Sequence, residues 1–339
     1  MTAVAPLCTI VPPYVLDRLA EDGHEPASRT LALDAVHRTA RLTADPAPPA
    51  AATLNRVVAD AGHAEQLPGR TVRTEGAGPV ADGSVNHAYD GLGATFALFA
   101  DAYGRRSIDD RGLRLDASVH YGRDYDNAFW DGRQMVFGDG DGVVFGDFTA
   151  CIDVIGHELT HGVTQFTAGL EYRGQSGALN ESVSDVFGSL VKQYALHQDA
   201  ADADWLIGAG LLAPGVQGVA LRSMKAPGTA YDDPRLGKDP QPAHLRDYVR
   251  TAQDNGGVHI NSGIPNHAFY LLATALGGPA WERAGRIWYD ALTGRRLAAT
   301  AGFAAFARAT VAAARARYAE PSVADTVTAA WATVGVSTA

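Results

Sequence analysis

Residues 152–163 read IDVIGHELTHGV and contain a His-Glu-x-x-His pattern at His157, Glu158 and His161. The apolar residues recur three or four positions apart, as on one face of an α-helix: Ile152, Ile155, Leu159 and Val163. The two histidines are then one turn apart on the opposite face. Two such imidazoles can bind one Zn²⁺, and a glutamate beside the first can act as a general base. This stretch therefore predicts a catalytic metal site on a helix, although a five-residue pattern also arises by chance.

A hydrolytic zinc site needs a third protein ligand and a fourth position that stays open for water. Residues 177–194, GALNESVSDVFGSLVKQY, have helical periodicity and place Glu181 and Asp185 one turn apart. Glu181 is a candidate third ligand, and Asp185 can accept the free N–H of a ligating histidine. Two acids at this spacing are also typical of a solvated helix face, so the pair does not decide the matter alone.

A third cluster, DNGGVHINSG at residues 254–263, has a glycine-rich turn with Asp254 five positions before His259. A carboxylate that orients an imidazole keeps it protonated where a developing oxyanion needs a donor. A lone histidine is more often a structural residue, but the acid and the turn favour a functional one here.

Composition excludes several classes of protein. The 339 residues contain 28 Lys and Arg against 38 Asp and Glu, a formal charge of −10, and no basic stripe indicates nucleic acid or an anionic membrane as a partner. Two cysteines, Cys8 and Cys151, cannot form a disulfide framework. The sequence shows no apolar run of about 18 residues and no secretory signal. We expect a protein that is cytoplasmic as synthesised, or secreted by a route without a cleaved signal peptide.

The chain changes character along its length. Residues 1–45 combine a proline-marked apolar opening with one short helix, and a Pro- and Ala-rich linker follows. Composition alone favours an ordinary N-terminal arm and linker, and the linker is also a candidate boundary or cleavage site. Residues 46–150 show mostly strand and turn signals, with one helix at about 85–103. Residues 151–339 contain Ala- and Leu-rich helical segments near 150–165, 179–196, 262–276, 279–292 and 300–317. We predict an α+β fold with a β-rich N-terminal lobe and an α-helical C-terminal lobe.

Four more segments accompany HELTH: DNAFWDGRQMVFGDGDG (126–142), GLEYRGQSGALNESVSD (169–185), LRSM (221–224) and DNGGVHINSGIPNHAFYLLA (254–273). With their order and spacing, the chain from about residue 54 to 339 resembles the thermolysin family of zinc metallopeptidases. This resemblance implies a two-lobe fold with the zinc-binding helix between the lobes. The opening CTIVPPYVL resembles the short pro-segment of the protealysin-like subgroup, which implies that residues 1–45 are a removable pro-segment.

The resemblance also implies residue roles. It assigns three zinc ligands, His157, His161 and Glu181, with Glu158 as general base and Asp185 as the partner of His157. Tyr172 and His259 would donate hydrogen bonds to the tetrahedral intermediate, and Asp254 would orient His259. The substrate would be held by the backbone of Asn127 and Ala128 through β-augmentation, by Arg222 on the carbonyl beyond the scissile bond, and by an apolar pocket of Phe145, Phe148, Val154, Ile207 and Leu221.

One departure concerns calcium. The positions that match the five acids of the family's double calcium site are Asp153, Lys192, Asp204, Leu206 and Ala209. Because three of the five acids are absent, and a cation replaces one of these three, this site is not expected to hold two Ca²⁺ ions, which need several oxygen ligands. Zn²⁺ is the expected cofactor, and Ca²⁺ is doubtful.

These observations predict a zinc-dependent neutral endopeptidase, made as a precursor with an inhibitory pro-segment, that cleaves before hydrophobic residues. Its partners would be peptide and protein substrates, and the protein would be a monomer. The sequence does not decide whether a protein inhibitor also binds it. Two other classes are weighed. A peptide-binding protein without activity is disfavoured because ligands, base and donors are all present, and a hydrolase of small amides is disfavoured by the peptide-binding edge DNAFW.

Overall fold

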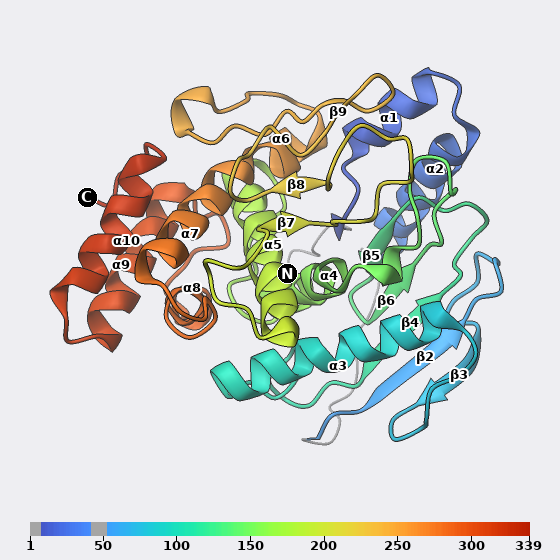
Figure 1. The fold of residues 1–339 in the computed structure, drawn as a ribbon, viewed down its shortest axis with the longest axis horizontal. Coiled ribbons are helices and arrows are strands. Elements are labelled where there is room, and N and C mark those ends of the chain that lie inside the picture. The colour runs from blue at the N-terminus through green and yellow to red at the C-terminus, as the bar shows by residue number, and fades with distance from the viewer. Residues whose placement is uncertain (1–7, 42–52) are drawn as a thin grey trace.

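The structure is a computed structural model of the 339-residue chain and describes residues 8–41 and 53–339. In this part of the chain a six-stranded mixed sheet has the order β1-β5-β6-β4-β2-β3 (Figure 1). The β4 strand pairs in parallel with β2 and β6, and the other pairs are antiparallel. The strands are β1 (Cys8–Thr9), β2 (Arg56–Asp60), β3 (Arg70–Thr74), β4 (Leu115–Val119), β5 (Ala128–Trp130) and β6 (Gln134–Phe137). The β-rich N-terminal lobe is therefore confirmed.

The strand signal continues past β6 in the sequence, but the chain turns there. Asp141 Oδ1 accepts the backbone N–H groups of Val143, Val144 and Phe145 at 2.8–3.1 Å. A side chain that satisfies three consecutive donors competes with a strand ladder. The segment therefore forms a tight loop that leads into the short 3₁₀ helix Phe148–Ala150.

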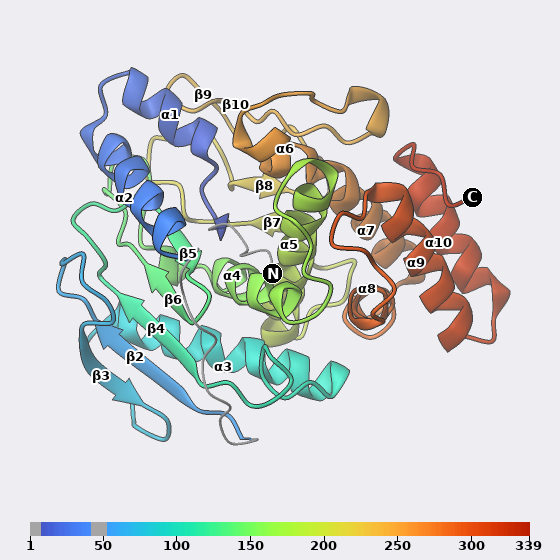
Figure 2. The ribbon, with the colours of Figure 1, turned by 180° about the vertical axis from the view of Figure 1, so that it is seen from behind.

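Helices form the rest of the fold. The β-rich lobe contains α3 (Gly83–Tyr103), and the C-terminal lobe contains α4 (Ile152–Gln165), α5 (Gly174–Leu196), α6 (Asp254–Asn261), α7 (Gly263–Leu276), α8 (Ala284–Thr293), α9 (Phe303–Arg317) and α10 (Pro321–Thr333). Helices α7–α10 group beyond α5, away from the sheet (Figure 2). Two small hairpins, β7 (Leu206–Ile207) with β8 (Arg222–Ser223) and β9 (Asp232–Asp233) with β10 (Gly237–Lys238), lie between α5 and α6 in sequence. The α-helical C-terminal lobe is confirmed, and α6 and α10 are additions to the predicted helices. The predicted glycine-rich turn is the non-helical start of α6 at Asn255, Gly256 and Gly257.

The N-terminal segment contains more structure than the one short helix that we predicted. The chain forms β1, then α1 (Pro13–Glu21) and α2 (Glu25–Arg41). The helices separate at residues 22–24, where Gly23 has φ +86°, a conformation that glycine adopts readily. The predicted cleavage region, residues 42–52, lies outside the described residues.

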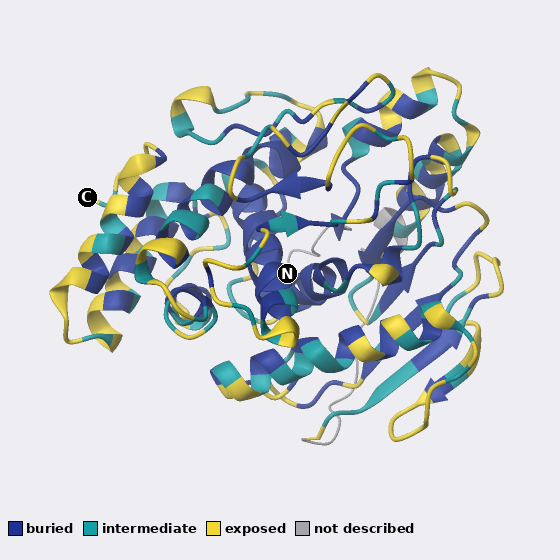
Figure 3. Cartoon of the chain, in the orientation of Figure 1, coloured by how far each residue is buried: buried dark blue, intermediate teal, exposed yellow. Residues whose placement is uncertain are grey.

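Helices α4 and α5 pack against each other in the centre of the molecule and are buried over most of their length (Figure 3). Glycine permits their close approach, because a Cβ atom at Gly188 would lie 2.4 Å from the carbonyl oxygen of Asp153. The apolar core around them includes side chains from both lobes and from the N-terminal segment. This packing fixes the distance between the His-Glu-x-x-His helix and the helix that carries Glu181. No helix among the described residues is long and apolar enough to cross a membrane.

Candidate active site

The three predicted zinc ligands converge between α4 and α5. The Nε2 atoms of His157 and His161 are 3.0 Å apart. The two carboxylate oxygens of Glu181 lie 3.5 Å from these nitrogens, one from each. All three side chains are buried.

The hydrogen bonds around the histidines determine which nitrogen faces inward. His157 Nδ1 donates to Asp185 Oδ1 at 2.8 Å, and His161 Nδ1 donates to Asn180 Oδ1 at 2.9 Å. In neutral rings both Nε2 atoms then carry lone pairs, which face each other at 3.0 Å. Among the described residues Glu181 Oε2 has no hydrogen-bond partner. Two facing lone pairs beside an unpaired buried carboxylate oxygen fit a cation, and two imidazoles with one carboxylate are a ligand set that Zn²⁺ accepts.

Glu158 follows His157 on α4 and lies beside this ligand set. One of its oxygens is within 4.8 Å of a ring nitrogen of each of the two histidines. Its Oε2 atom accepts the backbone N–H of Trp130 on β5 at 3.1 Å. The carboxylate therefore lies between the metal ligands and the strand that was predicted to hold substrate.

Tyr172 and His259 reach the same point from other segments. The Tyr172 hydroxyl donates to Glu181 Oε1 and lies 3.2 Å from His259 Nε2. Asp254 holds His259 through its ring Nδ1 at 2.6 Å and its backbone N–H at 2.8 Å. Burial lowers the pKa of His259, but the negative charges of Glu181 and Asp254 outweigh it and raise the pKa to about 9. The ring is therefore a hydrogen-bond donor at neutral pH.

Arg222 on β8 joins the site through Asp185. Its guanidinium donates to both oxygens of Asp185 at 2.9 Å, and Asn266 donates to the same carboxylate at 2.8 Å. Burial raises the pKa of Asp185, but Arg222 and His157 hold it well below its ordinary value. Asp185 thus orients His157 and Arg222 together. The sequence assigned Arg222 to substrate only, and the roles of Asn180 and Asn266 were missed although both lie within the quoted segments.

The cleft beside these residues is occupied by the N-terminal segment of the same chain. Strand β1 pairs antiparallel with β5, and Ile10 donates its N–H to the carbonyl of Ala128 at 3.1 Å. Val11 donates its N–H to Asn127 Oδ1 at 3.0 Å. Ala128 therefore contributes its backbone, as predicted for substrate, whereas Asn127 contributes its side chain to this contact.

The carbonyl groups of the same segment meet the predicted catalytic donors. His259 Nε2 lies 3.0 Å from the carbonyl oxygen of Thr9, and Arg222 donates to the carbonyl oxygen of Ile10 at 3.0 Å. The Sγ atom of Cys8 lies within 4.8 Å of ligand atoms of His161 and Glu181. The segment thus lies along the catalytic residues as an extended peptide.

The prolines of this segment lie beyond the catalytic residues. From the sequence, the apolar segment 10–16 could fill the substrate groove without being cleaved, because Pro12 and Pro13 are poor scissile residues. Instead Pro13 begins α1, and the chain leaves the cleft after Val11. Proline suits the first helical position because no intrahelical bond is lost there. Protection of the Thr9–Ile10 bond therefore needs another cause.

The five predicted pocket residues are all buried. They lie in the loop after β6, the 3₁₀ helix, α4, β7 and the stretch before β8: Phe145, Phe148, Val154, Ile207 and Leu221. The rings of Phe145 and Phe148 have centroids 6.0 Å apart. Ile10 is fully buried as well, and Arg222, which holds its carbonyl, follows Leu221 in the chain.

Lys192 occupies the region that matches the double calcium site. Its ammonium lies 2.9 Å from Asp153, 2.9 Å from Asp204 and 2.9 Å from the carbonyl oxygen of Leu206. Burial lowers the pKa of Lys192, but these acids more than offset that effect and raise it. The Lys192 ammonium thus lies among oxygen atoms that could otherwise bind a metal ion.

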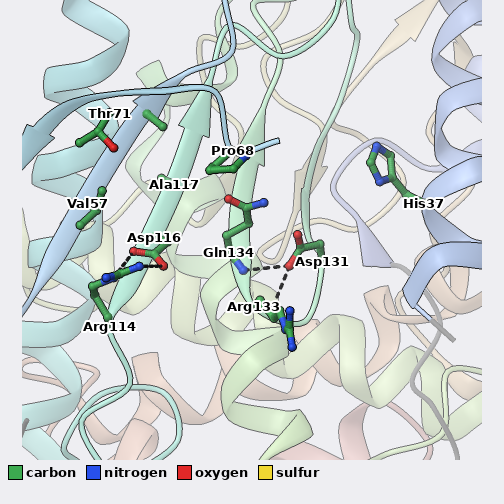
Figure 4. Close-up of a pocket in the computed structure, with 11 residues that line it drawn as sticks. His37, Val57, Pro68, Thr71, Arg114, Asp116, Ala117, Asp131, Arg133 and Gln134 are labelled. Atoms are coloured by element: carbon green, nitrogen blue, oxygen red, sulfur yellow. Dashed lines mark hydrogen bonds and ion pairs between the residues drawn. The ribbon is translucent and has the colours of Figure 1, made fainter. Parts of the chain in front are cut away.

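A hollow of about 440 Å³ lies elsewhere, over β2, β4 and β6 (Figure 4). Its lining includes the Arg114–Asp116 ion pair, and Asp131 accepts the backbone N–H groups of Arg133 and Gln134 at 2.7 and 2.8 Å. Arg114, Asp116 and Asp131 therefore have partners within the lining. None of the predicted site residues lines it.

Comparison with known proteins agrees with this geometry. Residues 66–165 match the family model of the thermolysin metallopeptidase catalytic domain, and residues 168–336 match that of its alpha-helical domain. An extracellular metalloprotease of Pectobacterium carotovorum subsp. carotovorum is 52% identical over 337 residues, which cover 98% of this chain and 97% of the relative. The chain belongs to the thermolysin family.

Within this thermolysin family the likeness extends to the N-terminal segment. Protease PrtS of Photorhabdus sp. (strain Az29) is 48% identical over 96% of this chain and 91% of its own. The structure of the precursor of protealysin, a metalloproteinase from Serratia proteamaculans, superposes with a TM-score of 0.90 at 54% identity, covering 97% of this chain and all of that one. The chain is thus a protealysin-like metalloendopeptidase, with the two-lobe α+β fold of the thermolysin family.

Proposed function

We propose that this protein hydrolyses internal peptide bonds of proteins with Zn²⁺ held by His157, His161 and Glu181. The observation that carries the proposal is the pair of facing Nε2 lone pairs beside the unpaired oxygen of Glu181. When bound, Zn²⁺ polarises the substrate carbonyl and lowers the pKa of water toward about 7.

The protein side chains would supply the proton transfers and bind the substrate. Glu158, as general base, takes a proton from water and returns it to the leaving amine. Tyr172 and His259 donate hydrogen bonds to the oxyanion, and Asp254 keeps the His259 ring oriented for this. Arg222 binds the next carbonyl of the substrate while Asp185 fixes its guanidinium.

A direct test is incubation of the purified protein with unfolded casein, followed by mass spectrometry of the products. Internal fragments, lost on zinc removal and restored by added Zn²⁺, would support an endopeptidase. Tight casein binding without fragments would support a peptide-binding protein without activity. Hydrolysis limited to small amides would support a hydrolase of small amides.

We further propose that residues 1–45 act as an inhibitory pro-segment that binds as a substrate does. With His259 at the Thr9 carbonyl and Arg222 at the Ile10 carbonyl, the Thr9–Ile10 bond lies where a scissile bond would lie. Cys8 lies close enough to His161 and Glu181 for its thiolate to take the open zinc position, a good ligand there. Occupation of that position would exclude the nucleophilic water and so spare the bond.

Specificity should depend on the residue just after the scissile bond. The buried apolar pocket should prefer Leu, Ile, Val, Phe or Met there, and Ile10 in the pro-segment agrees with this. Burial of such a side chain contributes about 1.5–3 kcal/mol, or about 10- to 150-fold in preference. Sequencing the casein fragments measures this directly. Cleavage mainly before charged residues would contradict the pocket assignment.

Calcium should have little effect on this protein, because the Lys192 ammonium already neutralises Asp153 and Asp204. Urea unfolding in the inactive Glu158→Gln background should give the same midpoint with and without added Ca²⁺. Lys192→Met should lower the free energy of unfolding by about 3–5 kcal/mol, since it leaves a buried charge unpaired. A large stabilisation of the unchanged protein by Ca²⁺ would show that a calcium site remains.

We propose that the enzyme acts as a monomer outside the cell that makes it. The support is that the Pectobacterium relative is described as extracellular. Detection of trimmed protein in culture medium, with a cytoplasmic marker absent, would test the location.

A further inference from the structure

A second group of metal-type ligands lies where the pro-segment meets the β-rich lobe. His24 lies in the turn between α1 and α2 and approaches two carboxylates, Asp126 and Asp141. Asp126 lies between β4 and β5, and Asp141 follows β6. One ligand atom of each residue lies within 4.8 Å of the others. Bound together, they would connect the pro-segment to the catalytic part of the chain at a point separate from the three zinc ligands.

The two carboxylates at this point lack enough partners. Asp126 is fully buried, and its Oδ1 atom accepts the backbone N–H of Asp141 at 2.9 Å. Its Oδ2 atom has no hydrogen-bond partner among the described residues. A buried ionised carboxylate is costly unless it is paired, and burial accordingly raises the pKa of Asp126 to about 8. A bound cation would take the place of that proton.

His24 Nε2 lies 2.8 Å from Asp141 Oδ2 as an ion pair, although Asp141 Oδ2 has no aligned hydrogen-bond donor within the described ranges. His24 Nδ1 accepts the backbone N–H of Ala27 at 3.3 Å, so binding of a metal ion at Nε2 would move the ring proton to Nδ1 and break that bond. Close nitrogen and oxygen atoms without hydrogen-bond alignment are expected where both face a common ion. The same combination, close ligand atoms and an orphaned carboxylate oxygen, occurs at the zinc ligands.

We propose that His24, Asp126 and Asp141 bind a divalent transition-metal ion that links the pro-segment to the catalytic lobe. One imidazole and two carboxylates suit ions such as Zn²⁺ and Mn²⁺, and two carboxylates match the charge of a divalent ion. The site exists only while His24 is held in place. Metal binding here does not require the pro-segment to be inhibitory, so it can be tested apart from the proposed function.

The test uses full-length Glu158→Gln protein loaded with zinc, in which self-cleavage is not expected. Mn²⁺ is the probe because it competes poorly for a site already filled by Zn²⁺, and the loss of the free-ion signal in electron paramagnetic resonance counts bound Mn²⁺. We expect one bound Mn²⁺ per chain in addition to zinc. Atomic spectrometry after dialysis against excess Zn²⁺ should likewise find a second zinc ion.

Variants identify the ligands. His24→Gln and Asp126→Asn should each weaken Mn²⁺ binding by at least about 100-fold, because even groups outside a metal's ligand shell are worth about 10- to 100-fold. Asn at position 126 can still accept the N–H of Asp141. The matched control is His37→Gln, also in the pro-segment, where His37 contacts the Tyr121 hydroxyl at 2.6 Å and Mn²⁺ binding should be unchanged.

Two results would overturn the proposal. One is the absence of both Mn²⁺ and a second zinc ion in the full-length protein. The other is unchanged binding in His24→Gln, a partly exposed position whose replacement should not prevent folding even if Asp126→Asn does. Trimmed wild-type enzyme, which lacks His24, should bind Mn²⁺ at least about 100-fold more weakly than the full-length chain, and equal binding would equally contradict the proposal.

Discussion

The Glu158→Gln variant is expected to bind zinc as the unchanged protein does and to lose peptide hydrolysis by about 10²- to 10⁴-fold, the usual contribution of a general base. Glutamine keeps the size of the side chain and can still accept the N–H of Trp130. It cannot take a proton from water. Because the three zinc ligands are untouched, the metal should remain.

Two measurements on one preparation check this expectation: zinc content by atomic spectrometry and casein hydrolysis per molecule of folded protein. His161→Ala is the contrasting variant, because it removes a ligand and should lower zinc content and activity together. Substantial activity in folded, zinc-loaded Glu158→Gln would exclude Glu158 as the base. If cleavage of the pro-segment is self-catalysed, the same variant should also accumulate at full length.

The uncut chain is expected to be about 10³-fold less active than the trimmed enzyme. A segment tethered to its binding site acts at an effective concentration on the order of mM. Even a segment that binds with a Kd of about 1 μM would then leave only about 0.1% of the clefts open. The contacts of Thr9 with His259, of Ile10 with Arg222 and of Val11 with Asn127 supply such binding.

Activity should be followed while full-length protein is trimmed by a trace of mature enzyme. Cys8→Ser should make the uncut chain measurably active if the thiolate holds the open zinc position. Arg18→Gln serves as control, because Arg18 binds carbonyl groups at Pro234 and Arg235 outside the cleft. A fully active uncut chain would refute inhibition, whereas a tightly inhibited Cys8→Ser chain would refute only the role of the thiolate.

Local patterns in the sequence were sufficient for several features. Helical periodicity and the His-Glu-x-x-His spacing determined that His157, Glu158 and His161 share one helix and that the histidines face one way. Such features need only neighbours within a turn or two. The segments that resemble the thermolysin family also indicated both lobes, which the structure and the comparisons confirm.

Tertiary structure decided what depends on residues far apart in the chain. The approach of α4 and α5, which lets Glu181 face both histidines, depends on glycine contacts such as that of Gly188 with Asp153. The ion pair of Asp185 with Arg222 and the seating of Thr9 beside His259 join positions up to 250 residues apart. The sequence alone predicted which side chains carry the chemistry, but their partners, and the edge strand on which the pro-segment lies, follow from long-range packing that no local pattern encodes.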